Sequence, residues 1–334
     1  MIGLKQLADD LSICRVLNGM WQVSGAHGYI EPQKAIDEMI EYHNSGFTTW
    51  DLADIYCPAE LFIGKFRKKL EKLKGKDELQ NSQALTKFVP NSGPMTKSIV
   101  EHYVDKSLEN MNTSCLDLIQ FHWWDYNNPS YIDALVHLSN IRDKGKIKHI
   151  GLTNFDTERL QIIKDQGVEI ISNQVQYSIL DQRAEKLMVP FSQQNRIHLL
   201  SYGTLLGGFL SEKYLDSPEP LGGDLSTASL KKYYNMINAW GGWELFQELL
   251  HVLLQISKKH DCSIANVATS FILDKPTVAG VIIGARLGIS EHREDNSRVY
   301  DVQLDSEDQS MIKFVTEKSN DLFEAIGDCG AEYR

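Results

Sequence analysis

Four ionisable side chains lie at or just beyond the ends of three consecutive apolar, strand-like runs. Asp51 and Tyr56 follow the run at 48–50, Lys87 lies in the run 83–88, and His122 follows the run 116–121. A carboxylate, a phenol, an ammonium and an imidazole can together transfer a proton. Taken singly, each has a plain structural alternative: a helix cap, a packing residue, a solvated strand end or a satisfied polar group. No packing requirement explains all four at successive strand ends, so the set indicates a catalytic site.

This set of groups fits the reduction of a carbonyl by hydride. The carbonyl oxygen becomes an alkoxide and needs a proton, which Tyr56 could supply, since a phenol has an ordinary pKa of about 10. We expect the Lys87 ammonium to stabilise phenolate and lower that pKa, and Asp51 to keep Lys87 charged and oriented. His122 is expected to donate to the carbonyl oxygen and help relay the proton. None of the four can carry hydride, so a cofactor is implied.

The elements that would position these residues follow from alternating apolar patterns. Strand-like segments alternate with helical ones, which predicts a parallel sheet with right-handed crossovers. Eight strands favour a closed (β/α)8 barrel, the TIM barrel, over an open doubly wound sheet, and no GxGxxG motif follows an early strand. In such a barrel the strand ends converge on one face. The predicted strands lie near 16–22, 48–53, 83–88, 116–121, 148–153, 170–175, 197–202 and 278–284.

The chain is predicted to be one domain, 1–334, with the barrel at about 14–300 and a C-terminal helix and tail at 301–334. About 75 residues separate the seventh and eighth strands, more than a helix and two turns need. Within them, the segment 211–242, rich in proline and glycine, is predicted to be a long excursion over the catalytic face. The sequence assigns no role to the tail 327–334.

Composition narrows the classes of partner. The chain has 334 residues, 42% hydrophobic and 24% charged, as globular proteins do. A net charge of −11 argues against a nucleic-acid partner. No signal peptide and no apolar stretch long enough to span a bilayer are recognisable. Five scattered cysteines without a CxxC pair indicate reduced thiols in a cytoplasmic protein. No metal site is predicted, and the oligomeric state is left open.

Seven ordered segments of the chain resemble the aldo-keto reductase family. Residues 46–56 resemble the segment with the catalytic Asp and Tyr, which keep the same separation, and Lys87 and His122 match the other two catalytic positions. The resemblance implies a barrel fold, a nicotinamide cofactor and reduction of an aldehyde or ketone to the alcohol. Asp51, Tyr56, Lys87 and His122 would be the catalytic residues.

The resemblance also implies a cofactor site. Thr153, Asn154 and Gln174 would bind the nicotinamide carboxamide, and Tyr202 would stack on its ring. Arg286 is the best candidate for the 2′-phosphate of NADPH, because a guanidinium can fork onto phosphate oxygens. His292 or Arg293 would be the second contact, although two extra residues before Asn296 depart from the family pattern. NADPH is therefore expected, with NADH as the less favoured alternative. The predicted set is Met20, Trp21, Asp51, Thr153, Asn154, Gln174, Tyr202, Gly203, Leu205, Gly284, Arg286, His292 and Asn296.

Aromatic residues at the strand ends predict a substrate pocket for an apolar or sugar-like carbonyl. The pocket would be lined by Trp21, Tyr56, His122, Trp123 and Trp124, while Trp240 and Trp243 either join it or anchor the excursion. Cys57, beside Tyr56, is either an oxidant-sensitive thiol or a small packing residue.

Two other functions remain open. One is a non-catalytic or weakly catalytic, cofactor-binding regulatory subunit that acts on a partner protein through the same barrel. The other is a phosphate-binding isomerase barrel, which would not need the pair of Tyr56 and Lys87. The sequence does not identify the physiological carbonyl substrate.

Overall fold

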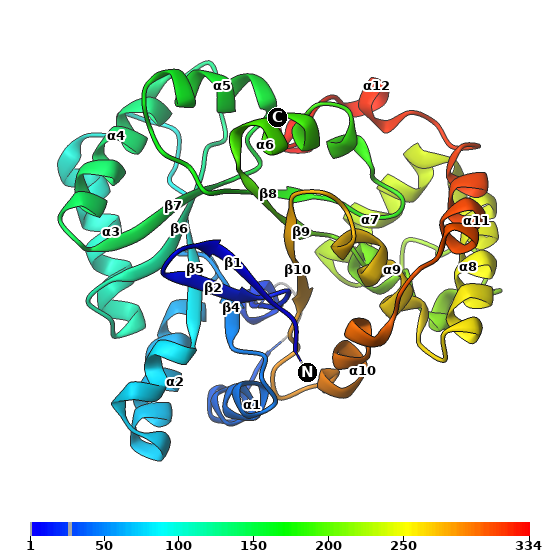
Figure 1. Cartoon of the computed structure of the whole chain (residues 1–334), viewed down its shortest axis with the longest axis horizontal. Coiled ribbons are helices and arrows are strands. Elements are labelled where there is room, and N and C mark those ends of the chain that lie inside the picture. Colours follow the sequence, from blue (N-terminus) through cyan, green and yellow to red (C-terminus); the bar gives the residue numbers. More distant parts are fainter. Residues whose placement is uncertain (1, 26–28) are drawn as a thin grey trace.

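A closed barrel of eight parallel strands forms the centre of the computed structural model, which describes residues 2–25 and 29–334 (Figure 1). Neighbouring strands follow one another in chain order, and β10 pairs with β3 to close the barrel. The predicted (β/α)8 fold is thereby confirmed. The strands are β3 (Val16–Gly19), β4 (Thr49–Asp51), β5 (Gln83–Phe88), β6 (Leu116–His122), β7 (Ile147–Thr153), β8 (Ser172–Gln176), β9 (His198–Tyr202) and β10 (Val278–Gly284).

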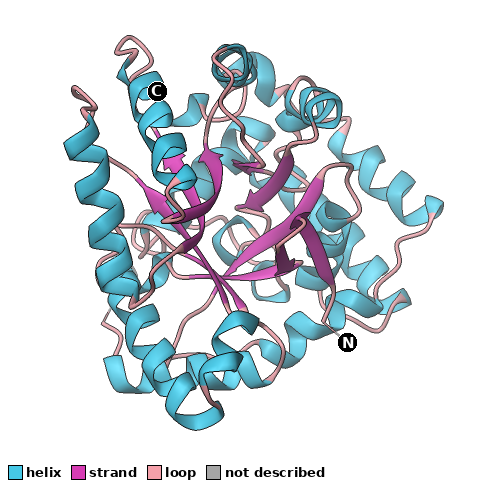
Figure 2. Ribbon diagram, turned by 60° about the vertical axis from the view of Figure 1, so that its left-hand side comes forward, coloured by secondary structure: helices cyan, strands magenta, loops and turns pink. Residues whose placement is uncertain are grey.

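Helices surround the barrel on its outside (Figure 2). Their apolar faces point inward: in the helix at 130–143, for example, Leu135, Leu138 and Ile141 recur at helical spacing and are buried, and this helix packs on the strand at 147–153. The helices are α1 (Pro32–Asn44), α2 (Ala59–Lys74), α3 (Lys97–Met111), α4 (Ser130–Asp143), α5 (Thr157–Asp165), α6 (Met188–Asn195), α7 (Ala228–Trp240), α8 (Gly242–Lys259), α9 (Ile264–Leu273), α10 (Arg293–Arg298), α11 (Ser306–Thr316) and α12 (Leu322–Ile326).

Side-chain caps fix where several of these helices begin. Asp305 accepts hydrogen bonds from the backbone N–H groups of Glu307 and Asp308, and the Asp308 side chain accepts one in return from the backbone of Asp305. This capping box satisfies amide groups that the first turn of a helix leaves without partners. It fixes the start of α11.

An N-terminal hairpin, absent from the sequence prediction, closes one end of the barrel. Its strands β1 (Leu4–Ala8) and β2 (Leu11–Cys14) pair antiparallel. Three buried hairpin side chains, Leu7, Leu11 and Ile13, pack with apolar side chains of the barrel, among them Leu85 and Leu118. Side chains alternate along a strand, so Leu85 and Lys87 share one face of β5, with Lys87 farther toward its carboxyl end. The hairpin therefore covers the amino-terminal end, opposite the predicted site.

The long excursion between β9 and β10 contains the helix α7. Its Tyr233 packs directly against Gly203 and Gly207, which follow β9 and adopt left-handed φ angles of 73° and 67°. A side chain at either glycine would strain the backbone and collide with Tyr233. The excursion therefore lies beside the carboxyl end of β9, as the prediction for 211–242 requires.

Smaller differences from the prediction occur at the ends of elements. β3 ends at Gly19, and Trp21–Ser24 forms a short 3-10 helix, so the first strand is shorter than the predicted 16–22. In residues 2–25 and 29–334, no helix combines the length and apolar character needed to cross a membrane. The one-domain organisation of 1–334 remains a prediction.

The packing of the hairpin leads to a prediction about stability. Leu11 is 1% exposed, so Leu11→Ala should lower the free energy of unfolding by about 2–5 kcal/mol through lost burial and the cavity left behind. Leu4→Ala is the matched control, because Leu4 lies on the same hairpin with 63% of its surface exposed. It should change the free energy by less than about 0.5 kcal/mol. Equal effects in urea unfolding would contradict the role assigned to the hairpin.

Candidate active site

A buried ion pair forms the centre of the site. The Nζ atom of Lys87 lies 2.6 Å from Oδ2 of Asp51, and the two side chains are only 4% and 5% exposed. Lys87 also donates to the backbone oxygen of Leu52 at 3.1 Å, and its Nζ lies 5.3 Å from the ring centroid of Tyr56. Three of the four predicted catalytic residues are therefore in contact. His122 ends β6, the strand next to β5.

Two glutamines complete the surroundings of Asp51. Its Oδ1 accepts hydrogen bonds from Nε2 of Gln120 at 3.0 Å and from Nε2 of Gln174 at 2.7 Å. Gln174 also donates to Oε1 of Gln120 at 2.8 Å. The prediction missed Gln120, although it lies two residues before His122 and so faces the same side of β6. The amide nitrogen of Gln174 is bound inside the barrel, so its Oε1 is the atom left to accept a hydrogen bond from a carboxamide.

The protonation of Tyr56 differs from the prediction. Burial raises the pKa of its phenol, and the nearby Asp51 carboxylate raises it further. Burial also lowers the pKa of Lys87, while Asp51 opposes that change. The net pKa of Tyr56 nevertheless lies above its ordinary value, because burial and the Asp51 charge dominate and the Lys87 ammonium is itself paired with Asp51. Tyr56 therefore keeps its proton near neutral pH, which is the state a proton donor needs.

The tautomer of His122 can be deduced from its contacts. Nδ1 lies 2.9 Å from the backbone oxygen of Thr153, which can only accept, so Nδ1 carries the hydrogen. Burial lowers the pKa of His122 to about 4, so the ring is neutral at pH 7. Nε2 then offers a lone pair, and it is buried without a hydrogen-bond partner among the described residues. The expected donation from His122 to a carbonyl oxygen is therefore corrected: the ring can accept a hydrogen from a hydroxyl group.

Asp54 is a half-buried carboxyl group that sequence analysis did not select. Its carboxylate accepts hydrogen bonds from the backbone N–H groups of Ile55 at 2.8 Å and Val89 at 3.1 Å. Burial raises its pKa to about 7, although these hydrogen bonds and the charge of Lys87 act in the opposite direction. Asp54 thus titrates near neutral pH three residues from the ion pair.

The structure places the predicted nicotinamide-binding residues on neighbouring strand ends. Thr153 ends β7, and its Oγ1 is buried with no hydrogen-bond partner in the described part of the chain. Asn154 follows with a left-handed φ of 58°, and its Oδ1 accepts from the hydroxyl of Tyr202, which ends β9, at 2.8 Å. A buried hydroxyl without a partner, beside an amide whose oxygen is already used, fits the carboxamide of a nicotinamide. These residues are compatible with the expected cofactor.

The rest of the predicted cofactor set lies around the same end of the barrel. Met20 is fully buried and its backbone N–H donates to the oxygen of Asp51, whereas Trp21 is half-buried. Gly203 and Leu205 follow β9, and both are half-buried. The expected Tyr202 stacking is not tested.

The predicted phosphate contacts lie after β10. Gly284 ends that strand, Arg286 and His292 are exposed, and Asn296 is buried in α10. Arg293, the alternative second contact, instead pairs with Glu291 at 2.9 Å. Among the residues that the structure describes, Arg286 makes no ion pair.

The two neighbouring tryptophans after β6 have different roles. The ring of Trp124 lies 4.3 Å from that of His122 at an interplanar angle of 85°, so it stands at the candidate pocket. Trp123 is fully buried and donates to the backbone oxygens of Asp125 and Asn128. Its assignment to the pocket is therefore corrected, because the side chain points the other way. Trp240 and Trp243 are buried in the apolar core, and Trp243 donates to the oxygen of Ser217, so both anchor the excursion.

The tail 327–334, to which the sequence assigned no role, reaches the site. The ring of Tyr333 lies 6.2 Å from that of His122, and Arg334 donates to the backbone oxygens of Trp123 at 2.6 Å and Asn154 at 2.9 Å. The tail therefore contributes to the surroundings of the catalytic residues.

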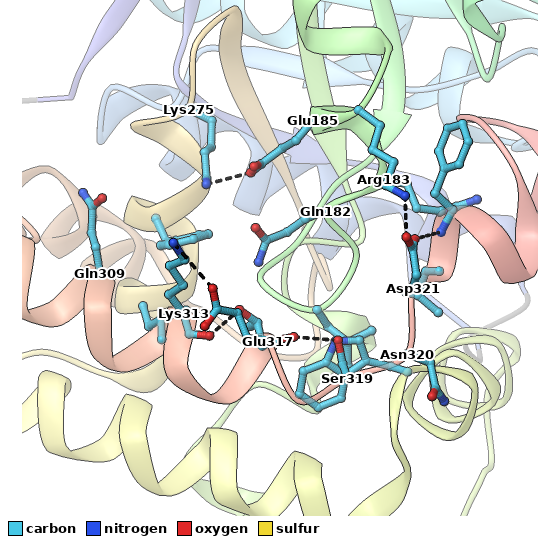
Figure 3. A pocket seen from close by; sticks show the side chains of 18 of the residues that line it. Gln182, Arg183, Glu185, Lys275, Gln309, Lys313, Glu317, Ser319, Asn320 and Asp321 are labelled. Atoms are coloured by element: carbon cyan, nitrogen blue, oxygen red, sulfur yellow. Dashed lines mark hydrogen bonds and ion pairs between the residues drawn. The ribbon is translucent and has the colours of Figure 1, made fainter.

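A cavity of about 750 Å³ lies elsewhere, on the flank of the barrel (Figure 3). Residues from α9, α11 and the segment before α6 line it, and none of them belongs to the predicted site. Its charged groups pair with each other, as Lys275 does with Glu185 at 2.7 Å and Lys313 with Glu317 at 3.5 Å. In residues 2–25 and 29–334, no three His, Cys, Asp or Glu side chains are grouped to hold a metal ion. All five cysteines are free thiols.

Comparisons with known proteins agree with this geometry. A family model described as the aldo/keto reductase family matches residues 15–317. The NADH-specific methylglyoxal reductase of Escherichia coli is 24% identical over 329 residues, which cover 92% of this chain and 96% of that protein. The flagellar radial spoke protein 5 of Chlamydomonas reinhardtii is 28% identical over 260 residues. That match covers 66% of this chain and about half, 49%, of the radial spoke protein.

The fold also has a close structural relative. The structure of a glycerol dehydrogenase from Gluconobacter oxydans superposes with a TM-score of 0.76 and 19% sequence identity. The match covers 97% of this chain and 96% of that one. At this identity the likeness concerns the fold.

Asp54 leads to a prediction about pH. Its pKa of about 7 in the folded protein lies above the ordinary value of about 3.9 for an unfolded chain, so the folded state binds the proton more tightly. This contribution to stability is present at low pH and is lost as pH rises through 7. Asp54→Asn should therefore reduce the loss of unfolding free energy between pH 5 and pH 8, measured by urea unfolding.

Asp77→Asn is the control for this experiment, because it removes an exposed carboxylate from the same part of the chain. Its pH dependence should match that of the wild type. An Asp54→Asn protein with the full wild-type pH dependence would contradict the assignment.

Proposed function

Because the chain belongs to the aldo/keto reductase family, we propose that it reduces an aldehyde or ketone to the alcohol with NADPH. The observation that carries this proposal is the contact of Asp51, Lys87 and Tyr56 at the carboxyl ends of neighbouring strands. In a (β/α)8 barrel this is the end at which catalytic residues lie. Carbonyl substrates and nicotinamide cofactors are what the family shares.

In the proposed reaction Tyr56 gives its proton to the substrate oxygen. The nicotinamide supplies the hydride when bound, so the substrate carbon receives hydride while the oxygen receives the proton from Tyr56. The raised pKa of Tyr56 keeps the phenol protonated before this step, but it also makes the phenol a weaker acid, so transfer of the proton depends on stabilisation of the phenolate. The Lys87 ammonium beside the ring stabilises the phenolate that remains.

The other polar residues hold these groups in place. Asp51 keeps Lys87 charged in a buried position, and Gln120 and Gln174 orient its carboxylate. Thr153 and Asn154 would bind the nicotinamide carboxamide, and Tyr202 would lie under the ring. His122, with its free lone pair on Nε2, can orient a hydroxyl group of substrate or product. These assignments leave Tyr56 as the proton donor.

The preference for NADPH rests on Arg286. This guanidinium is exposed just beyond β10, and the net charge of −11 would repel a phosphate elsewhere on the surface. His292, also exposed, is the candidate second contact. Because a relative is described as NADH-specific, the choice between the two cofactors has to be measured on this chain.

A second candidate function follows from the match to a radial spoke protein. That similarity supports a regulatory or structural subunit, built on the same barrel, that binds a partner protein. Intact catalytic geometry favours the reductase, because a subunit without catalysis would not need a buried Asp51–Lys87 pair. Turnover of carbonyls by the purified protein decides between the two.

Removal of the proton donor tests the mechanism. Tyr56→Phe keeps the ring and removes the hydroxyl, so kcat for aldehyde reduction should fall about 10²–10⁴-fold, the usual effect of losing general acid catalysis. Oxidation of NADPH is followed at 340 nm with a panel of aldehydes and ketones. Tyr29→Phe is the control, since Tyr29 is 81% exposed, and its kcat should stay at the wild-type value. Near-normal turnover by a folded Tyr56→Phe protein would exclude Tyr56 as the acid.

Cofactor choice is tested at Arg286. Arg286→Ala should weaken NADPH binding by about 1.5–3 kcal/mol, the range for a hydrogen bond to a charged group. NADH binding should hardly change, because NADH lacks the 2′-phosphate. Both cofactors are titrated by fluorescence against both proteins at two salt concentrations. If NADPH and NADH lose the same binding free energy in Arg286→Ala, Arg286 only supports the loop. If the wild type binds NADH more tightly than NADPH, the NADPH assignment is overturned.

A further inference from the structure

The tail 327–334 is fixed across the site by buried interactions. The carboxylate of Glu332 pairs with Arg183 at 3.1 Å, and these two side chains are only 6% and 2% exposed. Arg183 is itself held by Asp181 at 2.8 Å. Asp328 accepts a hydrogen bond from the backbone N–H of Thr157 at 2.8 Å. These bonds fix the tail at both of its ends and so determine where Tyr333 lies.

Tyr333 lies between the catalytic residues and a lysine of the excursion. Its ring meets those of His122 and Trp124 edge-on at 6.2 Å and 6.4 Å. Its hydroxyl is 3.3 Å from that of Tyr202 and accepts a hydrogen bond from Nζ of Lys232 at 2.5 Å. The phenol therefore links the surroundings of His122 to Lys232.

Lys232 is a half-buried cation enclosed by aromatic rings. Its Nζ lies 5.0 Å, 5.4 Å and 4.4 Å from the ring centroids of Tyr202, Tyr233 and Tyr333. The ion pairs in the described part of the chain include none to Lys232, although acidic residues outnumber basic ones by 45 to 34. An ammonium group has three N–H donors, and the contacts here supply one oxygen acceptor, Tyr333. The ammonium group therefore has donors left for a ligand.

We propose that Lys232 and Tyr333 form an anion-binding point at the edge of the catalytic site, which holds a carboxylate or phosphate group of the carbonyl substrate. The inference rests on the proposed reductase function and names the substrate class. An anionic substrate is favoured because Tyr333 contacts His122 and Trp124 on the substrate side. The diphosphate of the cofactor shares this chemistry and is the other source of an anion, since Lys232 also lies over Tyr202.

Matched substrates test the proposal. 4-Carboxybenzaldehyde is compared with 4-methylbenzaldehyde, and glyceraldehyde 3-phosphate with glyceraldehyde. For each pair, the kcat/KM of the charged substrate is divided by that of the neutral substrate. In Lys232→Met this ratio should fall at least tenfold, mainly because the KM of the charged substrate rises. Lys231→Met, an exposed neighbour in α7, should keep the wild-type ratio. Lys232→Arg keeps the charge and should retain most of the preference, and Tyr333→Phe should lower the ratio less than Lys232→Met.

Other outcomes overturn the proposal. An unchanged ratio in the Lys232→Met protein would show that Lys232 packs against the tyrosine rings without binding the substrate anion. Weaker NADPH binding in Lys232→Met, together with an unchanged ratio, would assign the anion to the cofactor and remove the substrate class.

A binding measurement keeps this test separate from the test of the reductase function. Quenching of tryptophan fluorescence is titrated with 4-(hydroxymethyl)benzoate and with benzyl alcohol, without cofactor. The wild type should bind the carboxylate at least tenfold more tightly than Lys232→Met does, even if no carbonyl is turned over. Equal affinities would overturn the anion-binding point, whereas an absence of turnover with every carbonyl would overturn only the reductase.

Discussion

The buried ion pair between Asp51 and Lys87 is the interaction on which the site depends. Removing two charges from water costs several kcal/mol per ion, and only good geometry and further hydrogen bonds compensate for that cost. Here Gln120 and Gln174 provide those bonds to Asp51, and the backbone oxygen of Leu52 provides one to Lys87. The four side chains come from β4, β5, β6 and β8. The charge pair, like the apolar core, therefore requires these strands to keep their relative positions.

The same burial controls how the other catalytic groups are protonated. It raises the pKa of Tyr56 and lowers that of His122, so both are neutral at pH 7. Among the four predicted catalytic residues, the charge is then confined to Asp51 and Lys87, which compensate each other. A site of this kind is neutral overall, so the attraction of an anionic substrate depends on cations outside it. Lys232, brought by the excursion, is one such cation, and Arg334 of the tail is another.

The sequence predicted the barrel well because eight strand-like segments alternate with helical ones along the chain. It also predicted the convergence of Asp51, Tyr56 and Lys87, since strand order alone brings them together. It could not predict the tautomer of His122, which depends on a contact with the backbone of β7. The sequence could not show which of Trp123 and Trp124 faces the pocket. The direction of the chain after β6 decides this. Tyr333 was missed because its position depends on long-range ion pairs of the tail.

The N-terminal hairpin and the catalytic residues lie at opposite ends of the barrel. Leu7, Leu11 and Ile13 fill the barrel end remote from the chemistry, so selection on them concerns folding alone. The excursion and the tail lie at the other end of the barrel, and their sequences can diverge without disturbing the packing of the hairpin. Relatives could therefore acquire new substrates by changing α7 and the tail, while an unchanged hairpin preserves enough stability to tolerate the intermediate sequences.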